Sequence, residues 1–369
     1  MTIHQYLGSL LLLGGIGMST GSAQSTNVLT ATNSSDRLPN IRLEPAGPET
    51  KNRLGLSYRM GLNISVDFKR FGGLALSDPG PATGGAVNRN YDNGYNRVDS
   101  STNSGGRTWY WGYQSSQSIQ GSNLVLQSYS TPANASSKNR EDDPQHGFEI
   151  NYQRELYRKD RWRFGAEAAF GYSLISINDS RTLRNTVYRT NDTFALNGVI
   201  PPNPPYNGTF QGPGPLIDSE PLSRSVDVLS RAATITGERD LDAHVFTLRL
   251  GPYLEVPLND RFSVFVNGGL TLGVGYTKFR FNETVVISDP AYDVTLSSQR
   301  RSASGSETDF LIGAYAGAGI NYAMTKEWGL FASAIYQAAG RTTNREGGKE
   351  SILDLGQSII VSFGVSYSF

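Results

Sequence analysis

Hydrophobic and polar residues alternate along eight stretches of this chain. The last stretch, residues 359–369, carries apolar or aromatic side chains at the odd positions and mainly serine or glycine at the even ones. A period of two is the period of a β-strand whose two faces meet different surroundings. The sequence therefore predicts an all-β fold with eight strands. The other seven strands are expected at residues 54–69, 147–156, 162–174, 241–258, 262–276, 310–322 and 328–339.

Two of these strands depart from a simple alternation. In residues 328–339, Phe331 and Ile335 oppose other large apolar residues, so both faces of this strand are apolar. Beyond the fifth strand, Phe279 and Phe281 fall on the opposite parity from the apolar residues before them. We expect a β-bulge at that point, because one extra residue in a strand reverses the direction of the side chains that follow.

The connections between the strands alternate in length. Long loops are expected near residues 72–145 and 178–239, with a further loop at 282–307 and a polar loop of middling length at 341–350. Short charged turns alternate with them. In membrane β-barrels, short turns face the periplasm and long loops lie outside the cell. Eight strands with this alternation form an antiparallel up-and-down barrel with both ends in the periplasm. An alternative is a barrel of ten or twelve strands, if residues 123–129 and 182–188 add hairpins.

Composition narrows the possible functions. The chain has 33 acidic and 33 basic residues, so it offers no basic field for nucleic acid. It contains no cysteine, which excludes disulfides, thiolate metal sites and cysteine nucleophiles. Beyond the N-terminus no apolar run is long enough for a spanning helix, so a membrane-embedded form must be a closed barrel. We expect no cofactor and no metal.

The first residues are typical of an export signal. Residues 1–23 contain an apolar stretch followed by Gly21-Ser22-Ala23, a small-residue cleavage site. No lysine or arginine precedes Arg37, so the usual positive segment is absent. Residues 24–53 are rich in Ser, Thr, Asn and Pro and are predicted to form a periplasmic tail or linker. The barrel then comprises residues 54–369.

The last strand resembles the closing strand of outer-membrane β-barrels, since it ends on an aromatic residue and its polar face is nearly all Ser and Gly. Across residues 54–369, loops excluded, the architecture resembles small barrels of the OmpA/OmpX type. The resemblance implies that Phe363, Tyr367 and Phe369 form a signal for the barrel-assembly machinery. It also implies a bacterial outer-membrane location, with outer-membrane lipid and lipopolysaccharide as neighbours.

Charged residues on the polar faces of the strands point to a filled interior. An eight-stranded barrel is just wide enough for side chains to fill it. Counted from the short turns, four charged residues fall at similar depths, and we predict that they form an interior network similar to the charged plug of OmpA-type barrels. The alternative is a proton or ion pathway through the same residues. The four are Arg59, Glu149, Glu167 and Arg249.

A possible catalytic pair lies at the outer end of the fourth strand. Asp242 and His244 resemble the Asp-x-His pair of omptin-type proteases, because residues two apart on a strand share a face. The pair also shares parity with Phe246 and Leu248, which are expected to face lipid. The resemblance covers only two residues, and the second acidic pair of that family has no counterpart. We therefore expect Asp242, His244 and also His146 to be solvated rim residues, and we expect no enzyme.

Four aromatic residues interrupt the polar first loop: Trp109, Tyr110, Trp111 and Tyr113. Exposed aromatic side chains stack on sugars or anchor protein partners. The same residues can instead form the packed core of a folded loop or extend the barrel wall at its aromatic girdle. Both interpretations are open at this point.

These observations favour an outer-membrane barrel with a side-chain-filled lumen, acting as a structural or surface-recognition and adhesion protein through its long loops. Its extracellular partner is unknown. The first alternative is a narrow porin-like channel for small solutes. The second is an outer-leaflet hydrolase that uses Asp242 and His244.

Overall fold

The structure, a computed structural model, describes residues 51–159 and 162–369. All of them belong to one unit of the fold. The expected export signal, residues 1–23, and the tail up to residue 50 lie outside the described residues. Of the expected tail, Asn52 and Arg53 already belong to the first strand. No helix among the described residues is long and apolar enough to cross a membrane.

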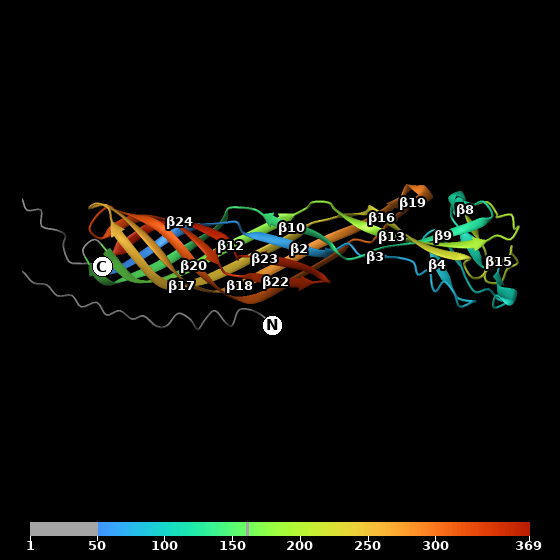
Figure 1. Cartoon of the computed structure of the whole chain (residues 1–369), viewed down its shortest axis with the longest axis horizontal. Helices are drawn as coiled ribbons and strands as arrows, with labels where there is room; N and C mark the ends of the chain where they lie inside the picture. The colour runs from blue at the N-terminus through green and yellow to red at the C-terminus, as the bar shows by residue number, and fades with distance from the viewer. Residues whose placement is uncertain (1–50, 160–161) are drawn as a thin grey trace, which may run out of the picture. The chain divides into compact units, whose positions relative to one another are not determined.

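Eight antiparallel strands close into a ring (Figure 1). The ring runs β17-β12-β11-β1-β24-β21-β20-β18, and β18 pairs back with β17. The predicted eight-stranded up-and-down barrel is confirmed, with its short turns at the same end as Asn52 and the chain end. The strands are β1 (Asn52–Leu62), β11 (Gln145–Lys159), β12 (Trp162–Asp179), β17 (Arg239–Pro257), β18 (Phe262–Asp289), β20 (Arg301–Ala323), β21 (Trp328–Ala338) and β24 (Ser358–Ser368).

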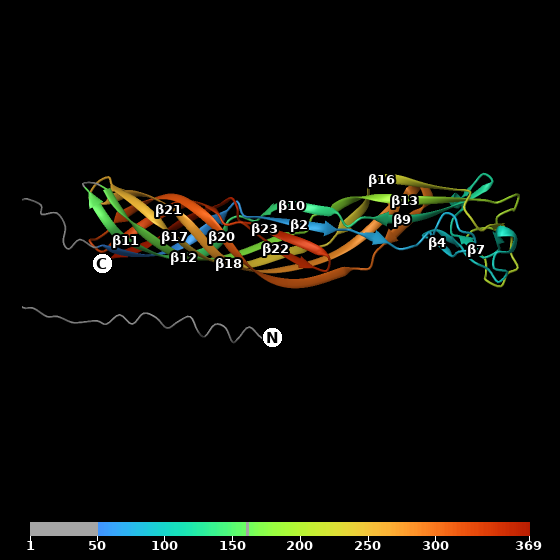
Figure 2. The same ribbon diagram turned by 60° about the horizontal axis from the view of Figure 1, so that its bottom comes forward.

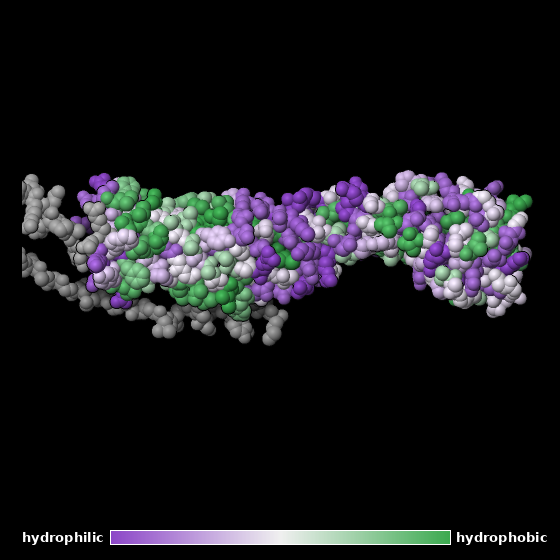
Figure 3. Space-filling view, viewed as in Figure 1, coloured by the Kyte–Doolittle hydropathy of each residue, from purple (hydrophilic) through white to green (hydrophobic). Residues whose placement is uncertain are grey.

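The outer wall of the barrel is apolar near the short turns. Figure 3 shows hydrophobic surface over this part of the strands, and Leu56, Ile150 and Leu248 are among its exposed residues. Contact of such an apolar surface with lipid is favourable, whereas its exposure to water is not. Aromatic side chains border the belt at both ends, as membrane interfaces favour. They are Trp162, Phe262, Tyr322, Trp328 and Tyr367 at the turn end, and Tyr58, Tyr172, His244 and Tyr276 at the other.

Beyond the belt, part of the long loops folds into a second sheet in the order β10-β2-β23-β22. Its strands are β2 (Ser65–Phe71), β10 (Ala135–Glu141), β22 (Arg341–Glu346) and β23 (Lys349–Asp354). β10 packs beside β12 and β22 beside β20, so this sheet and the far ends of β12, β17, β18 and β20 form a collar (Figure 2). The collar has a polar outer surface (Figure 3) and an apolar core.

The collar core is therefore the inverse of the membrane part, because the collar meets water where the belt meets lipid. Buried side chains from the loops and the long strands fill it, and a hydrophobic interior of this kind is the ordinary driving force of folding in water. Its members include Ile64, Val66, Phe68, Phe71, Ile175, Ile177, Leu241, Phe279, Phe281 and Leu353.

β18 crosses this boundary without interruption. Its pairing with β20 runs in one register from Phe262↔Tyr322 to Glu283↔Arg301. Tyr276 lies on the outer face, whereas Phe279 and Phe281 lie on the inner face and are buried. The predicted bulge is wrong. The aromatic residues change parity because the apolar surroundings move from the outside of the strand to its inside.

The first strand crosses the same boundary in another way. Asn63 has a φ of 57° and separates β1 from β2. This left-handed residue reverses the side chains that follow, so Tyr58 faces lipid while Val66 and Phe68 enter the collar core. Its backbone N–H donates to Asp143 Oδ2 at 2.6 Å. The single strand expected over residues 54–69 is therefore two strands, and the side chains at even positions point outward in the first and inward in the second.

The rest of the two long loops forms a head, defined as residues 74–131 and 183–236. Its main sheet continues from β18 in the order β16-β13-β9-β3, with β8 attached to β9, while β19 pairs with the end of β18. The sequence left open whether these loops are folded, and in the structure they are largely strands. Their bounds are β3 (Leu74–Ala75), β8 (Ile119–Gln120), β9 (Asn123–Thr131), β13 (Leu183–Ala195), β16 (Ser223–Thr236) and β19 (Val294–Ser297).

Two small sheets complete the head, one in the order β14-β7-β5-β4 and one pairing β15 with β6. The expected extra strands near 123–129 and 182–188 do exist as β9 and β13, but they join the head sheet and not the ring. The minor elements are β4 (Arg89–Tyr91), β5 (Gly94–Asn96), β6 (Arg107–Thr108), β7 (Trp111–Tyr113), β14 (Tyr206–Asn207), β15 (Ile217–Asp218) and the 3-10 turns η2 (Ser104–Gly106), η3 (Ser116–Ser118) and η4 (Pro290–Tyr292).

Candidate functional site

The four charged residues expected in the lumen come from four neighbouring strands and are all buried. Arg249 Nη2 donates to Glu149 Oε1 at 2.6 Å, and Arg59 Nη1 lies 3.8 Å from Glu149 Oε2. Gly171 makes room for this arrangement, because a Cβ there would lie 1.8 Å from Arg59 Nη1. The structure thus brings one carboxylate between two guanidinium groups.

Glu167 lies in the same layer but is not ion-paired in the same way. Its carboxylate accepts hydrogen bonds from Gln153 Nε2 at 2.6 Å and from Asn267 Nδ2 at 2.9 Å. Nearer the turns, a second layer joins Arg53 to Glu255 at 3.0 Å. Sequence reasoning missed this pair because Arg53 was assigned to the tail, and its partner is 202 positions away.

Apolar side chains fill the lumen next to the charged layer. Tyr315, Ile335 and Ile360 form a buried cluster, and the Tyr315 ring centre lies 4.9 Å from the Arg249 guanidinium carbon. Phe331 also points inward and is buried. The two apolar faces of the seventh strand now have a reason, since one face meets lipid and the other fills the lumen.

A further charged layer lies in the collar. Asp179 pairs with Arg239 at 3.1 Å, and Glu283 pairs with Lys349 at 2.8 Å. The guanidinium carbon of Arg239 and the ammonium of Lys349 both lie over the Phe71 ring, at 5.1 and 5.6 Å. Polar layers and an apolar core therefore succeed one another along the interior of the barrel and collar.

The pKa of Asp179 reflects this environment. Burial alone raises the pKa of a carboxyl group. Hydrogen bonds from Ser137 and Arg181, together with the charge of Arg239, outweigh burial and hold the pKa of Asp179 below its usual value. Asp179 is therefore ionised over the whole neutral range and acts as the anionic centre of its cluster.

Asp242 and His244 lie on the outer wall and do not line a cleft. Tyr172 Oη and His244 Nδ1 are 2.8 Å apart, and the His244 ring lies 6.2 Å from the Tyr276 ring. Asp242 accepts hydrogen bonds from Ser176 Oγ at 2.8 Å and Arg280 Nη2 at 2.7 Å. The histidine belongs to the aromatic border of the belt and the aspartate to an ion pair just beyond it.

His146 has an equivalent place on the neighbouring side of the barrel. Its Nδ1 contacts the Tyr58 hydroxyl, and the two rings stack with centres 5.9 Å apart. Both histidines therefore continue the aromatic border. Among the described residues, no cluster of three or more metal-binding side chains is present.

Two of the four loop aromatics form the core of the head. Trp111 and Tyr113 are fully buried, and Trp111 Nε1 donates to the Pro215 carbonyl at 2.7 Å. The Trp111 ring lies 4.7 Å from the Tyr206 ring. These contacts join the two long loops, since Tyr206 and Pro215 come from the second loop. For Trp111 and Tyr113, packing within a folded loop is the role that the geometry supports.

The other two loop aromatics remain partly exposed. Tyr110 lies 5.4 Å from the Tyr95 ring and 6.3 Å from the Phe210 ring, and Trp109 Nε1 donates to the Phe210 carbonyl at 3.2 Å. We name this set, with Arg97, the aromatic patch: Tyr95, Arg97, Trp109, Tyr110 and Phe210. Only Trp109 and Tyr110 were identified from the sequence, because the others come from separate segments.

The aromatic patch contains a cation over a ring. The Arg97 guanidinium carbon lies 4.5 Å from the Tyr95 ring centre and 5.6 Å from that of Tyr110. Burial raises the pKa of Tyr95, so its phenol stays protonated and can donate to the Gly208 carbonyl at 2.9 Å. Flat rings with an adjacent guanidinium group can stack on sugar rings and hydrogen-bond to their hydroxyl or acidic groups.

The C-terminal aromatic residues lie on the lipid-facing wall. Tyr367 packs 5.0 Å from Trp328 and 6.1 Å from Phe369, measured between ring centres. The Phe369 N–H donates to the Asn52 carbonyl at 2.9 Å, and the Asn52 N–H donates back at 3.1 Å. Phe363 packs on Tyr58 of β1 at 5.6 Å. These residues therefore stand at the seam where the last strand meets the first.

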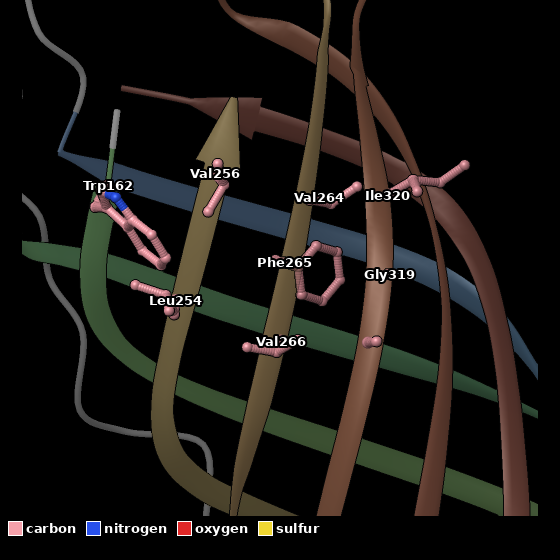
Figure 4. Close-up of a pocket in the computed structure, with 9 residues that line it drawn as sticks. Trp162, Leu254, Val256, Val264, Phe265, Val266, Gly319 and Ile320 are labelled. Atoms are coloured by element: carbon pink, nitrogen blue, oxygen red, sulfur yellow. The ribbon is translucent and has the colours of Figure 1, made fainter. Parts of the chain in front are cut away.

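A shallow groove marks the lipid-facing wall near the turn end (Figure 4). Gly319 of β20 lies beside Phe265 of β18, and a Cβ at Gly319 would lie 2.4 Å from Phe265 Cζ. The lining of the groove is apolar throughout except for the indole nitrogen of Trp162. Such a surface suits a hydrocarbon chain and carries no group for acid–base chemistry.

No protein-family model matches this sequence, and no curated protein does either. The solved structures that are similar to it include the following three. The attachment invasion locus protein Ail of Yersinia pestis, in complex with the heparin analogue sucrose octasulfate, is 12% identical over 87% of this chain and 100% of its own, with a TM-score of 0.29. OprG of Pseudomonas aeruginosa is 10% identical over 85% and 96%, with a TM-score of 0.28.

The outer-membrane protease OmpT of Escherichia coli is 9% identical over 88% of this chain and 99% of its own, with a TM-score of 0.30. OprG and OmpT are named as outer-membrane proteins. At these values the likenesses carry no argument about function, which has to rest on the geometry of this chain.

Proposed function

We propose that this protein is a bacterial outer-membrane surface-recognition protein, in which a closed barrel anchors a folded head outside the cell. The observation that carries the proposal is the folded structure of the two long loops. Apart from the segments that join the collar, they combine into one head with its own apolar core and a partly exposed aromatic patch.

The filled interior supports an anchoring role. The ion pairs of Arg249 and Arg53, the apolar cluster around Tyr315 and the collar core occupy successive levels. A porin-like channel needs a continuous aqueous path, and wide channels occur in barrels with many more strands. The ring has eight strands, whereas the porin-like alternative depended on a ring of ten or twelve.

The aromatic patch is the part of the head best suited to binding a ligand. Rings that are only partly buried gain affinity when they are covered, and aromatic residues and arginine carry most of the binding energy at interfaces. Its ligand class is a carbohydrate or a protein surface of the extracellular space. Outer-membrane lipid and lipopolysaccharide would surround the belt, and the assembly machinery would read the C-terminal strand.

The test is a binding screen with the full chain refolded in lipid nanodiscs. The probes are an array of sulfated, sialylated and neutral glycans and a panel of extracellular-matrix proteins. We expect retention on at least one probe, and a loss of about tenfold or more in the Trp109→Ala/Tyr110→Ala variant.

The matched control is Ile200→Ala, which removes an apolar side chain that is 88% exposed and lies in the head outside the patch. It should bind as the wild type does. Absence of binding to every probe, or equal binding by the patch variant, would contradict the proposal.

A further inference from the structure

One edge of the head sheet has no partner strand. β16 pairs with β13 on one side, from Thr193↔Ser223 to Leu183↔Ile235. On its other side only the last four residues pair with β18, from Ala233↔Ile287 to Thr236↔Thr284. Among the described residues, positions 223–232 therefore face no strand on that side. We name residues 223–231 the open edge (Figures 1 and 2).

The opposite edge of the same sheet is closed by the chain itself. β3 and β8 pair with the two ends of β9. Between them, the Asp92 N–H donates to the Gln127 carbonyl at 2.8 Å, and the Tyr129 N–H donates to Asp92 Oδ2 at 2.7 Å. Backbone groups at a sheet edge are thus satisfied internally on one side of the head and left to solvent on the other.

The open edge lacks most of the features that usually prevent edge pairing, and a β-bulge interrupts only its last part, at residues 230–232, where Arg231 has a φ of 59°. Lysine, proline and outward charges block edge pairing in natural proteins. The open edge reads Ser-Arg-Ser-Val-Asp-Val-Leu-Ser-Arg, with no lysine or proline. Arg224 and Asp227, the two charged residues within the edge, pair with residues of the neighbouring strand β13. Arg224 lies 2.6 Å from Asp192, and Asp227 lies 2.6 Å from Arg189.

Apolar side chains stand on the exposed face beside this edge. Val226 is 56% exposed and Val228 is 61% exposed. Tyr188 of β13 lies directly opposite Val228 and is also exposed. A strand added to β16 would place its own alternate side chains on these three, which is how sheet addition combines backbone hydrogen bonds with side-chain selectivity.

We infer that the open edge of β16 binds an extended segment of another protein as an added β-strand, with apolar residues at alternate positions and a carboxylate beside Arg231. This inference rests on the proposed recognition function and names a kind of partner for the head. The carboxylate follows from charge, because Arg231 is exposed at one end of the edge and Arg184 is exposed nearby, opposite Thr234.

The experiment uses the full chain in nanodiscs and a synthetic peptide of about nine residues, the length of the open edge. The peptide begins with glutamate and continues with alternating threonine and valine, because the first residue of an antiparallel strand lies opposite the Arg231 end of the open edge. Binding is measured by fluorescence anisotropy, and backbone hydrogen exchange is followed over residues 223–231. A peptide with proline in place of two threonines is the negative control, since it cannot complete the ladder.

We expect slower exchange in the open edge when the peptide binds, and no change with the proline peptide. Val226→Lys/Val228→Lys should weaken binding by about tenfold, because two cross-strand contacts are lost and charges are placed at the edge. Ile200→Lys adds a charge elsewhere on the head and should leave binding unchanged. Arg231→Glu should reverse the preference in favour of a peptide that begins with lysine.

Unchanged exchange of β16 amides without peptide shows that each variant keeps its fold. Absence of binding at millimolar peptide, binding without protection of residues 223–231, or equal binding by the double lysine variant would each overturn the inference. If array probes still bind through the aromatic patch in that case, the proposed function stands and only the open edge is rejected. If neither peptide nor array probes bind, both fail.

Discussion

Removal of Arg249 is the most informative perturbation of the lumen. Its guanidinium group lies 2.6 Å from Glu149 and beside the Tyr315 ring, with almost no exposure to solvent. Deleting one partner of a buried ion pair costs about 3–5 kcal/mol, because the remaining charge stays buried without compensation. Arg59 remains 3.8 Å from the same carboxylate and lessens this cost. For Arg249→Ala we therefore expect a loss of about 3 kcal/mol in the free energy of unfolding.

The assay is reversible urea unfolding in lipid vesicles, read by tryptophan fluorescence and by the heat-modified mobility of the folded barrel on gels. The control is Arg341→Ala, which breaks an exposed ion pair with Asp354 at 2.8 Å and should cost less than about 1 kcal/mol. In Arg59→Met/Glu149→Gln/Arg249→Met all three charges of the cluster are removed together, so none of them is left buried without a partner and most of the lost stability should return. An Arg249→Ala variant as stable as Arg341→Ala would refute the reasoning.

Three other changes test other parts of the fold. Trp111→Ala should cost the head about 3–5 kcal/mol by leaving a cavity in its core, seen as faster proteolysis of the head while the barrel keeps its gel mobility. Asn63→Val should lower stability by about 1–3 kcal/mol, since a β-branched residue resists the left-handed conformation, whereas Asn63→Gly should unfold at nearly the wild-type urea concentration. For Asp179, the folded-state pKa is depressed, so its stabilisation is present above the unfolded pKa near 4 and is lost as the pH falls through the folded value. Asp179→Asn should thus be less stable than the wild type at pH 7 and approach it at pH 3, and a constant difference across this range would be inconsistent with that assignment.

The barrel could be predicted from the sequence because lipid imposes a strict rule on each strand. Every spanning strand shows an apolar residue at alternate positions, whichever partner it pairs with. The same rule places Arg59, Glu149, Glu167 and Arg249 on inward positions before any contact is known. Their burial and contacts in the structure agree with that placement.

The collar and the head could not be predicted, because their strands obey no single external rule. Their partners are distant in sequence, as in Leu74↔Thr131 and the contact of Trp111 with Tyr206. Gly and Asn in these loops mark turns between short strands, and the same residues are typical of irregular loops. Composition alone does not separate the two cases.

The boundary between lipid and water misled sequence reasoning twice, for one physical reason. In β18 the strand is continuous, and the apolar residues change from even to odd positions. At Asn63 the strand is interrupted and its side-chain directions are reversed, while the apolar residues stay at even positions. Each solution moves apolar side chains from the outer wall to the collar core. A parity change alone therefore does not distinguish a bulge from a change of solvent.

The most direct test of a closed barrel that anchors a recognition head is the conductance of the refolded wild-type chain in planar lipid bilayers. We expect no channel current at moderate voltage, because charged and apolar layers fill the interior of the barrel along its length. A steady, reproducible open-channel current from the wild type would contradict it and would make transport the leading function.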